Sequence, residues 1–528
     1  MNGKTRLVVA GTTVALLAAG GYAVVDAAGF LRETGPLTAD EISSASRGFL
    51  DAWAEGDVAA AAGLTDDAGA ASDALTLFRR ELGPRLTVRP APTTSATVPF
   101  DVTVRLDGEG AGSVWTYGSA LTVVRDPESD GEARVAWSPK VVHPRLANGD
   151  RLELARADGM SVRVTDRDGR RLTAEEFPSL ASVIPELGER YGEKLGGRPG
   201  TEVRVTRRDG RPGPSLHEVS AGTPATLRTT LSARVQRAAE RAVADHPRSS
   251  AVAVAPSSGE ILAVANNRED GFNAAFLGQR APGSTLKVIT SAALLEEGVV
   301  SPFRRAECPK YAEYGGATFH NLDGFEIPGG TFSDAFARSC NTTFVKAADD
   351  IGSDTVAREA REVFGLGLEW HSGLATFDGS VPEAKGAEKA AGMIGQGRVQ
   401  VNALNMASVA ATVVAGRFRQ PVLVAPELAG QPVAEAPRSL PRGVAGQLRD
   451  LMRRTATEGT AARALAGLPG DVGAKTGSAE VGGAAVSDSW FTGFRDDVAA
   501  AAVVEEGGHG GDAAGPVVRE ILAAGDAP

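Results

Sequence analysis

Ser284-Thr285-Leu286-Lys287 is the stretch that decides the fold of this 528-residue chain. Two short patterns follow it in order, Ser339-Cys340-Asn341 and Lys475-Thr476-Gly477, and each of the three patterns (Ser-x-x-Lys, Ser-x-Asn and Lys-Thr-Gly) occurs once. Together they supply a nucleophilic hydroxyl, amines that can move its proton, and a hydroxyl-bearing strand for the substrate. The set predicts a serine acyl-transferase that works without histidine.

The lysines strengthen this interpretation. The chain holds nine Lys against 46 Arg, and two of the nine are Lys287 and Lys475. Guanidinium stays protonated at any ordinary pH, whereas a buried ammonium close to other charges can lose its proton and act as a base. Lysine is therefore expected where a proton must move.

The sequence around the first pattern indicates where its residues lie. Pro282-Gly283 predicts the start of a helix from Ser284 to Glu297, and a spacing of three places Ser284 and Lys287 on one face. The Lys287 amine can then take the hydroxyl proton as Ser284 attacks. This pattern alone is weak, because Ser and Lys three residues apart are common on exposed helices.

The third pattern predicts a substrate rail. Lys475, Thr476 and Gly477 are expected on an exposed edge strand, where the missing side chain of Gly477 would let a substrate backbone lie flat. Thr476 and Ser478 can bind a substrate carboxylate by hydrogen bonds, and Lys475 adds positive charge.

The second pattern opens a predicted helix over 341–348. Ser339 is expected to be a second proton carrier, and the Asn341 amide is expected to bind the acyl side of the substrate. A plain helix cap is the alternative, because Ser and Asn favour that position.

Cys308 and Cys340 are the only cysteines in the sequence. A disulfide between them would close a 33-residue loop, which is worth about 3 to 4 kcal/mol in the chain-entropy model. It would also fix the loop that carries Ser339 and Asn341. Two buried free thiols are the alternative.

The N-terminus carries a candidate membrane segment. Lys4 and Arg6 precede Leu7 to Val25, 19 residues without a charge, and Asp26 follows. Such a run can span a hydrocarbon core of about 30 Å, and the flanking charges predict a cytoplasmic N-terminus with the rest of the chain outside. A cleaved signal peptide is the alternative.

Length and pattern predict an α+β multidomain protein. The net charge of −11 and the absence of long basic runs argue against a nucleic-acid partner. A helical stretch over 37–64 precedes three predicted antiparallel strands, and turns are expected at 166–169 and 207–210. The expected regions are a cytoplasmic tip and transmembrane anchor (1–32), a small α+β domain (33–145), a pedestal domain (146–223) and the enzyme domain (224–528), the three strands being 98–106, 113–124 and 134–142.

The ordered patterns resemble those of the penicillin-binding transpeptidases. Further segments of the last 300 or so residues are similar to that family, namely 227–231 with Gln236, 251–263, 394–397 with 405–407, and 490–494. The resemblance implies a serine β-lactamase-like fold, in which an antiparallel sheet is flanked by helices.

The resemblance also implies roles for individual residues. Ser284 would be the acylated nucleophile, Lys287 its base, and Ser339 and Asn341 the proton relay and substrate-amide group. Lys475, Thr476 and Gly477 would bind the terminal carboxylate, and the backbone N–H groups of Ser284 and Ser478 would form the oxyanion hole. The implied substrates are peptidoglycan stem peptides ending in D-Ala-D-Ala, with β-lactams as mimics and wall-synthesis proteins as partners. No metal or cofactor is expected.

The N-terminal region adds a subtype. Phe49 to Trp53, Gly56-Asp57, Trp137 to Pro139 and His143 to Leu146 resemble the NTF2-like, MecA-type N-terminal domain of the low-affinity, resistance-associated class B proteins. Residues 166–169 resemble part of the class B pedestal, or dimerisation, domain. A monofunctional class B transpeptidase is thus implied.

Two other functions remain open. A D,D-carboxypeptidase or β-lactam-hydrolysing relative would pass the same acyl-enzyme to water, although the Glu-x-x-x-Asn of class A β-lactamases is absent between Asn341 and Lys475. A membrane-tethered β-lactam-binding protein without turnover is the other.

Overall fold

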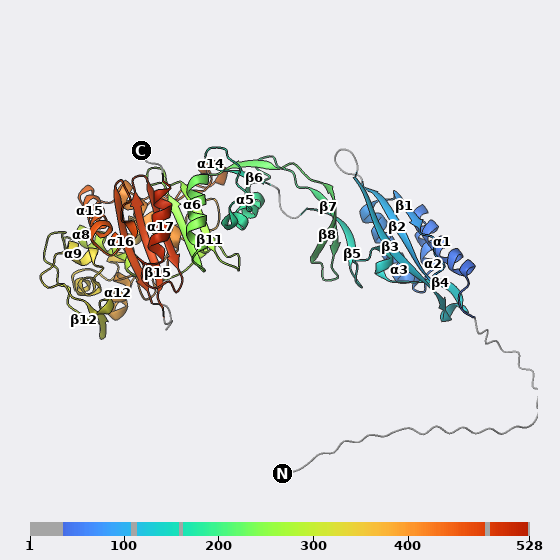
Figure 1. The fold of residues 1–528 in the computed structure, drawn as a ribbon, viewed down its shortest axis with the longest axis horizontal. Coiled ribbons are helices and arrows are strands. Elements are labelled where there is room, and N and C mark those ends of the chain that lie inside the picture. The colour runs from blue at the N-terminus through green and yellow to red at the C-terminus, as the bar shows by residue number, and fades with distance from the viewer. Residues whose placement is uncertain (1–34, 107–112, 158–161, 481–485, 526–528) are drawn as a thin grey trace, which may run out of the picture. The chain divides into compact units, whose positions relative to one another are not determined.

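A computed structural model describes residues 35–106, 113–157, 162–480 and 486–525. They fall into two compact units, one formed mainly by residues up to 153 and the other by most of the chain after it (Figure 1). The predicted membrane segment Leu7 to Val25 lies outside the described residues. Within the described part of the chain, every helix is too short or too polar to cross a membrane.

The N-terminal unit packs helices on a four-stranded antiparallel sheet (Figure 1). Strand β2 alternates exposed and buried residues, so one face of the sheet carries the core. Trp53 joins the layers, because its ring lies 5.5 Å from that of Phe78 and 6.1 Å from that of Phe100. The elements are α1 (Ala39–Glu55), α2 (Val58–Gly63), α3 (Ala68–Leu82), β1 (Leu86–Pro90), β2 (Thr97–Leu106), β3 (Ser113–Asp126), β4 (Glu132–Ala136) and α4 (Pro139–Val142), in sheet order β1-β2-β3-β4.

The helix ends follow the sequence. Thr38 and Glu41 form a capping box at the start of α1, and Gly56 ends it in the left-handed conformation with φ of 79°. The predicted strand 134–142 is wrong in its second half, because β4 stops at Ala136 and α4 begins at Pro139. Proline lacks the N–H that a strand would use, but this N–H is not needed in the first turn of a helix.

A turn-rich stretch follows. Strands β5 (Arg151–Arg156), β7 (Thr201–Thr206) and β8 (Pro212–Ser220) form a three-stranded sheet, and β6 (Val162–Thr165) pairs with β9 (Ala225–Arg228) in parallel. Both predicted turns are present, closed by N–H to O bonds from Asp166 to Arg170 at 2.8 Å and from Arg207 to Arg211 at 2.9 Å. Helix α5 (Val183–Tyr191) lies between these strands in sequence.

The C-terminal unit is built on a five-stranded antiparallel sheet covered by helices on both faces (Figure 1). Every residue of its middle strand β16 is buried. Ala499 and Ala501 face the core that includes α13, whereas Ala500 and Ala502 face the core that includes α6 and α17. The sheet order is β11-β10-β16-β15-β14, with β10 (Ser249–Val254), β11 (Ile261–Asn267), β14 (Val472–Ala479), β15 (Asp488–Arg495), β16 (Val498–Val504), α6 (Ala233–Ala244), α13 (Ala403–Ala415) and α17 (Ala514–Ala523).

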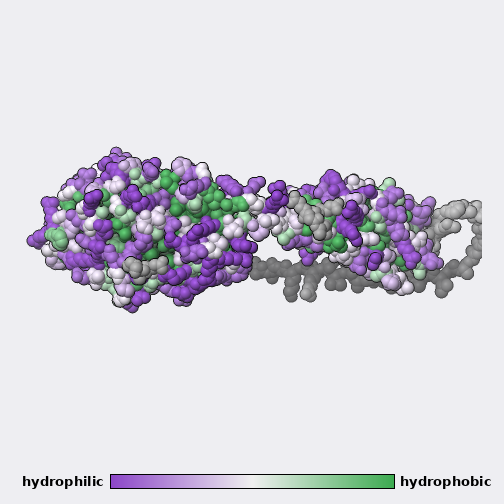
Figure 2. All heavy atoms as spheres, turned by 90° about the horizontal axis from the view of Figure 1, so that it is seen from above, coloured by the Kyte–Doolittle hydropathy of each residue, from purple (hydrophilic) through white to green (hydrophobic). Residues whose placement is uncertain are grey.

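The remaining elements of this unit include the helix that carries the first sequence pattern. The helix predicted from Ser284 begins as a 3₁₀ turn over Gly283–Leu286 and continues as α8 (Lys287–Glu296). The others are α7 (Ala274–Leu277), the hairpin of β12 (Tyr311–Tyr314) and β13 (Ala317–His320), α9 (Phe332–Ala337), α10 (Asn341–Lys346), α11 (Thr355–Glu362), α12 (Gly386–Met393), α14 (Pro426–Ala429), α15 (Arg442–Glu458) and α16 (Ala462–Leu465). On the face seen in Figure 2, hydrophilic side chains cover most of each unit, as expected from a chain that is 23% charged.

Candidate active site

The three sequence patterns meet at one cavity. It has a volume of about 790 Å³, and its lining includes Ser284 together with five other predicted residues, Ser339, Asn341, Thr476, Gly477 and Ser478. Ser284 is partly exposed at the start of the 3₁₀ turn. Its hydroxyl makes no hydrogen bond to any described residue, so it is open to the cavity.

Lys287 follows Ser284 by three residues, at the end of the same 3₁₀ turn, and is completely buried. Its Nζ lies 2.7 Å from Asn341 Oδ1 and 2.9 Å from the carbonyl oxygen of Ser339. Burial, together with the charge of Lys475, holds the pKa of Lys287 well below its usual value. A neutral amine has two N–H groups and one lone pair. In that form the two acceptors would take both N–H groups of Lys287, and its lone pair would remain to accept a proton.

Lys475 is the second buried amine. Its Nζ donates to Ser339 Oγ at 2.8 Å and to the carbonyl oxygen of Thr476 at 2.8 Å. Burial lowers the pKa of Lys475 to about 7. Ser339 therefore contacts both lysines, one through its carbonyl and the other through its hydroxyl, as a proton relay requires.

The conformation of Ser339 is unusual for a residue with a side chain. Its φ is +57°, in the left-handed region that glycine favours. The next residue, Cys340, forms a disulfide with Cys308, and the described residues contain no free cysteine. The Cys340 sulfur also accepts the N–H of Thr343 at 3.4 Å and caps α10. The disulfide thus holds the loop next to the strained residue.

Asn341 is occupied in a way that the sequence did not predict. Its Oδ1 accepts a hydrogen bond from the Lys287 amine, and its Nδ2 donates to the carbonyl oxygen of His320 at 2.9 Å. Its backbone N–H donates to Asn321 Oδ1 at 2.7 Å. The Asn341 amide thus holds Lys287 as well as lining the cavity in which it was expected to bind substrate.

The interpretation of Gly477 needs correction. Strand β14 is an edge strand, as expected. However, a Cβ at Gly477 would lie 2.7 Å from the carbonyl oxygen of Pro282 and 3.0 Å from the backbone nitrogen of Thr285. The space that the missing side chain leaves is filled by the nucleophile turn, not by a substrate backbone.

Several cavity residues carried no sequence signal. They come from segments far apart in the chain, namely His320, Asp323, Arg338, Thr460 and His509. Thr460 bonds the hydroxyl of Thr476 at an oxygen–oxygen distance of 2.5 Å. Isolated residues of this kind have no characteristic spacing, so only the folded chain brings them together.

This geometry is the one expected of a serine acyl-transferase that uses lysine rather than histidine to move protons. Comparison of the sequence with known protein families identifies the family. Residues 249–523 match the penicillin binding protein transpeptidase domain, and residues 42–150 match the NTF2-like N-terminal transpeptidase domain. The chain therefore belongs to the penicillin-binding protein transpeptidase family, and carries the NTF2-like N-terminal domain found with it.

Individual proteins that are similar to this chain belong to the same family. The peptidoglycan D,D-transpeptidase PbpA of Mycolicibacterium smegmatis is 32% identical over 354 residues, which cover 56% of this chain and 71% of the relative. A structure of penicillin-binding protein A from M. tuberculosis, a penicillin G acyl-enzyme complex, has a TM-score of 0.50 and 26% identity, covering 57% of this chain and 81% of that one. PBP2 of Pseudomonas aeruginosa shares the fold, with a TM-score of 0.55 and 22% identity over 69% of this chain and 96% of its own.

Proposed function

We propose that this chain is a peptidoglycan D,D-transpeptidase, which forms an acyl-enzyme on Ser284 with a stem peptide ending in D-Ala-D-Ala. The observation that carries the proposal is the buried Lys287, three residues after the open hydroxyl of Ser284, whose amine donates to Ser339 and Asn341. The PbpA relatives, which are named for this reaction, support it.

Acylation follows from the bonds in the site. The Ser284 oxygen attacks the penultimate carbonyl carbon of the substrate, and the neutral Lys287 amine takes the hydroxyl proton. The negative charge that develops on the carbonyl oxygen would be held by the backbone N–H groups of Ser284 and Ser478. The substrate carboxylate would lie against Thr476 and Ser478, close to the charge of Lys475.

The second half releases the leaving group. The bond between the carbonyl carbon and the last D-Ala nitrogen breaks, and the leaving amine needs a proton. In this proposal Lys475 and the Ser339 hydroxyl supply it; their bond of 2.8 Å and the contact of Ser339 with Lys287 support that role. An amine from a neighbouring peptidoglycan strand then attacks the ester carbonyl carbon and gives up a proton to the site's amines. The bond from that carbon to Ser284 Oγ breaks, and Oγ takes back the proton that Lys287 holds. A β-lactam would enter by the same first step.

We also infer that the chain is anchored in the cytoplasmic membrane by Leu7 to Val25, with both units on the extracytoplasmic face. A disulfide in the catalytic unit is consistent with that side, because such bonds persist outside the cytosol. Wall-synthesis proteins would be the partners there.

Intact mass of the full chain in detergent, after incubation with benzylpenicillin, tests the acylation step. Wild type should gain one penicilloyl mass and Ser284→Ala none. Ser487→Ala is the matched control, because Ser487 also lines the cavity but belongs to none of the three patterns, and it should keep the adduct. An adduct on Ser284→Ala would contradict the assignment.

The fate of the acyl group separates transpeptidase from carboxypeptidase. With a D-Ala-D-Ala stem peptide as donor and an amine as acceptor, a transpeptidase yields the cross-linked peptide as its main product. A product that is mainly the shortened peptide, at saturating acceptor, would favour the carboxypeptidase.

A further inference from the structure

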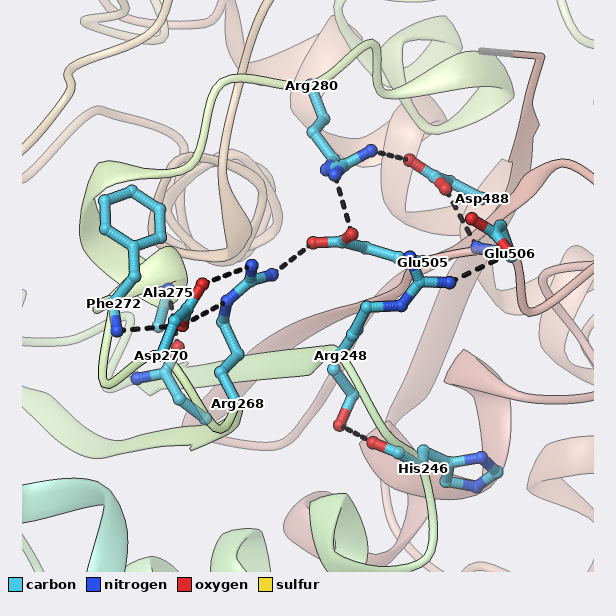
Figure 3. Close-up of polar contacts among 12 residues, drawn as sticks. His246, Arg248, Arg268, Asp270, Phe272, Ala275, Arg280, Asp488, Glu505 and Glu506 are labelled. Carbon is cyan, nitrogen blue, oxygen red and sulfur yellow. Dashed lines mark hydrogen bonds and ion pairs between the residues drawn. The ribbon is translucent and has the colours of Figure 1, made fainter. Parts of the chain in front are cut away.

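A group of paired charges surrounds Glu505, which follows β16 (Figure 3). The Glu505 side chain is only 8% exposed and lies between two guanidinium groups, with Arg268 at 2.5 Å and Arg280 at 2.7 Å. Arg280 also binds Asp488 at 3.0 Å, and the Asp488 side chain is 2% exposed. Arg280 thus bridges two carboxylates that are largely shielded from water.

Because the two carboxylates are shielded from water, the ion pairs of Arg280 are expected to matter more than exposed ones. An exposed ion pair contributes little, whereas removal of one partner of a buried pair leaves an uncompensated charge. The second oxygen of Asp488 accepts the backbone N–H of Glu506 at 3.0 Å, so only Arg280 among the described residues neutralises the Asp488 carboxylate. The Arg280 guanidinium is thus held by two carboxylates, those of Asp488 and Glu505.

The segments that Arg280 joins are those of the site. Arg280 lies four residues before Ser284, and its backbone is bridged to Val401 by bonds of 3.0 and 2.8 Å. Asp488 begins β15 and pairs with Ala479 of β14, the residue directly after Ser478. The ion pairs therefore connect the chain that leads into Ser284 with the strand pair that carries Ser478.

Where the Ser284 turn packs against β14, the contacts are between backbone atoms. A Cβ at Gly283 would lie 2.5 Å from the carbonyl oxygen of Ser478, and one at Gly477 would lie 2.7 Å from that of Pro282. Glycine contacts of this kind allow close approach but add little side-chain packing to hold it. The Gly283 N–H donates to the Gly395 carbonyl oxygen at 2.9 Å, and the Arg280 ion pairs add a second restraint on the spacing from outside the junction.

We propose that Arg280 is a positioning residue for acylation, acting through Asp488 and Glu505. It holds the Ser284 turn against β14, and so sets the spacing between the backbone N–H groups of Ser284 and Ser478. This inference rests on the proposed function, because it matters only if those two groups stabilise an oxyanion. A misplacement of about 1 Å in such a site can slow a reaction on the order of 100-fold.

The rate of acylation by a fluorescent penicillin, measured on the full chain over a range of penicillin concentrations, separates binding (Kd) from the acylation step (k2). Arg280→Met should lower k2 by about 10- to 100-fold with Kd changed by less than about threefold, since the substrate contacts remain. Arg280→Lys should restore part of k2. Asp488→Asn keeps the shape of the side chain and serves if Arg280→Met fails to fold.

The same group of charges offers a matched control. Arg248 pairs with Glu506 at 2.9 Å, both side chains are about half exposed, and neither lies in the segments around Ser284 or Ser478 (Figure 3). Arg248→Met should leave k2 unchanged. A double variant of Arg280→Met with Asp488→Asn should be no slower than the slower single variant, because both break one connection.

Two results would overturn the inference. Unchanged k2 in Arg280→Met would show that Arg280 does not position the site. An equal loss of k2 in Arg248→Met would show that any lost ion pair has the same effect. Failure of wild type to acylate, by contrast, would refute the proposed function itself and this inference with it, so the two failures are distinguishable.

Discussion

Burial of Lys475 should make the stability of the C-terminal unit depend on pH in a predictable direction. Burial lowers the pKa of Lys475 from 10.5 to about 7. Each unit of pKa is worth about 1.4 kcal/mol, so holding this lysine in the folded state costs about 4 to 5 kcal/mol when the unfolded chain is protonated. Between pH 7 and 10.5 the unfolded chain binds more protons than the folded one. Stability should therefore rise with pH across this window, while the full cost remains below pH 7.

Lys475→Met isolates this effect. The substitution removes the titrating amine and leaves Ser339 Oγ and the Thr476 carbonyl without their donor, which costs about 1 to 3 kcal/mol. At pH 7 we expect the variant to be more stable than wild type by about 2 kcal/mol. By pH 10 this advantage should be gone. Catalytic activity should be lost throughout.

The measurement is urea unfolding at a series of pH values. Unfolding is monitored by hydrogen-exchange pulse labelling of β15 and β16, so that the signal reports the C-terminal unit alone. The quantity of interest is the difference in unfolding free energy between Lys475→Met and wild type. Lys310→Met, which removes an exposed lysine of the same unit, controls for the loss of one ammonium. A difference that stays flat from pH 6.5 to 10 would refute the reasoning, because it would mean that Lys475 keeps its proton when buried.

Three further outcomes are expected. The pair Cys308→Ser and Cys340→Ser should lose about 3 to 4 kcal/mol of stability in denaturant titrations, and unchanged stability would count against a constraining role for the disulfide. Gly477→Ala should keep its circular dichroism but acylate at least about tenfold more slowly, since the new Cβ would press on the Pro282 carbonyl oxygen at 2.7 Å; acylation at the wild-type rate would show that the turn yields freely. Burial, and after it the nearby carboxylates, raise the pKa of Glu359 from 4.5 to about 7. Between these pH values the folded state binds one more proton at Glu359 than the unfolded chain does, so the folded state loses stability as pH rises through that range. Glu359→Gln should accordingly be more stable than wild type above pH 7 and lose this gain near pH 5 in thermal unfolding, and a gain independent of pH would exclude titration as the cause.

The residues that sequence could predict are those with local signals. Ser284 and Lys287 are three apart at a helix start, and Lys475 to Gly477 lie on a strand that is recognisable from its neighbours. Such patterns involve few residues at fixed spacing, and they can therefore be recognised in the sequence alone. The order of the three patterns then indicated one site, because none is informative alone.

The residues that sequence could not predict depend on long-range contacts. Asn321 holds the backbone N–H of Asn341, and Thr460 holds Thr476, yet neither stands in a pattern of its own. The role of Gly477 was misjudged for the same reason, since its neighbour in space is a turn almost 200 residues away. The end of β4 was misplaced because alternation was followed past Pro139, whose missing N–H favours the helix.

Ser339 is the residue on which these constraints converge. Its carbonyl oxygen accepts from Lys287, its hydroxyl accepts from Lys475, and it makes both contacts with a φ of +57°. A left-handed conformation costs a residue with a Cβ about 1 to 2 kcal/mol. Glycine would relieve that cost, but it would remove the hydroxyl that connects the two amines. The disulfide at Cys340, worth about 3 to 4 kcal/mol, more than offsets the strain. The site thus keeps a conformation that local preference alone would not select.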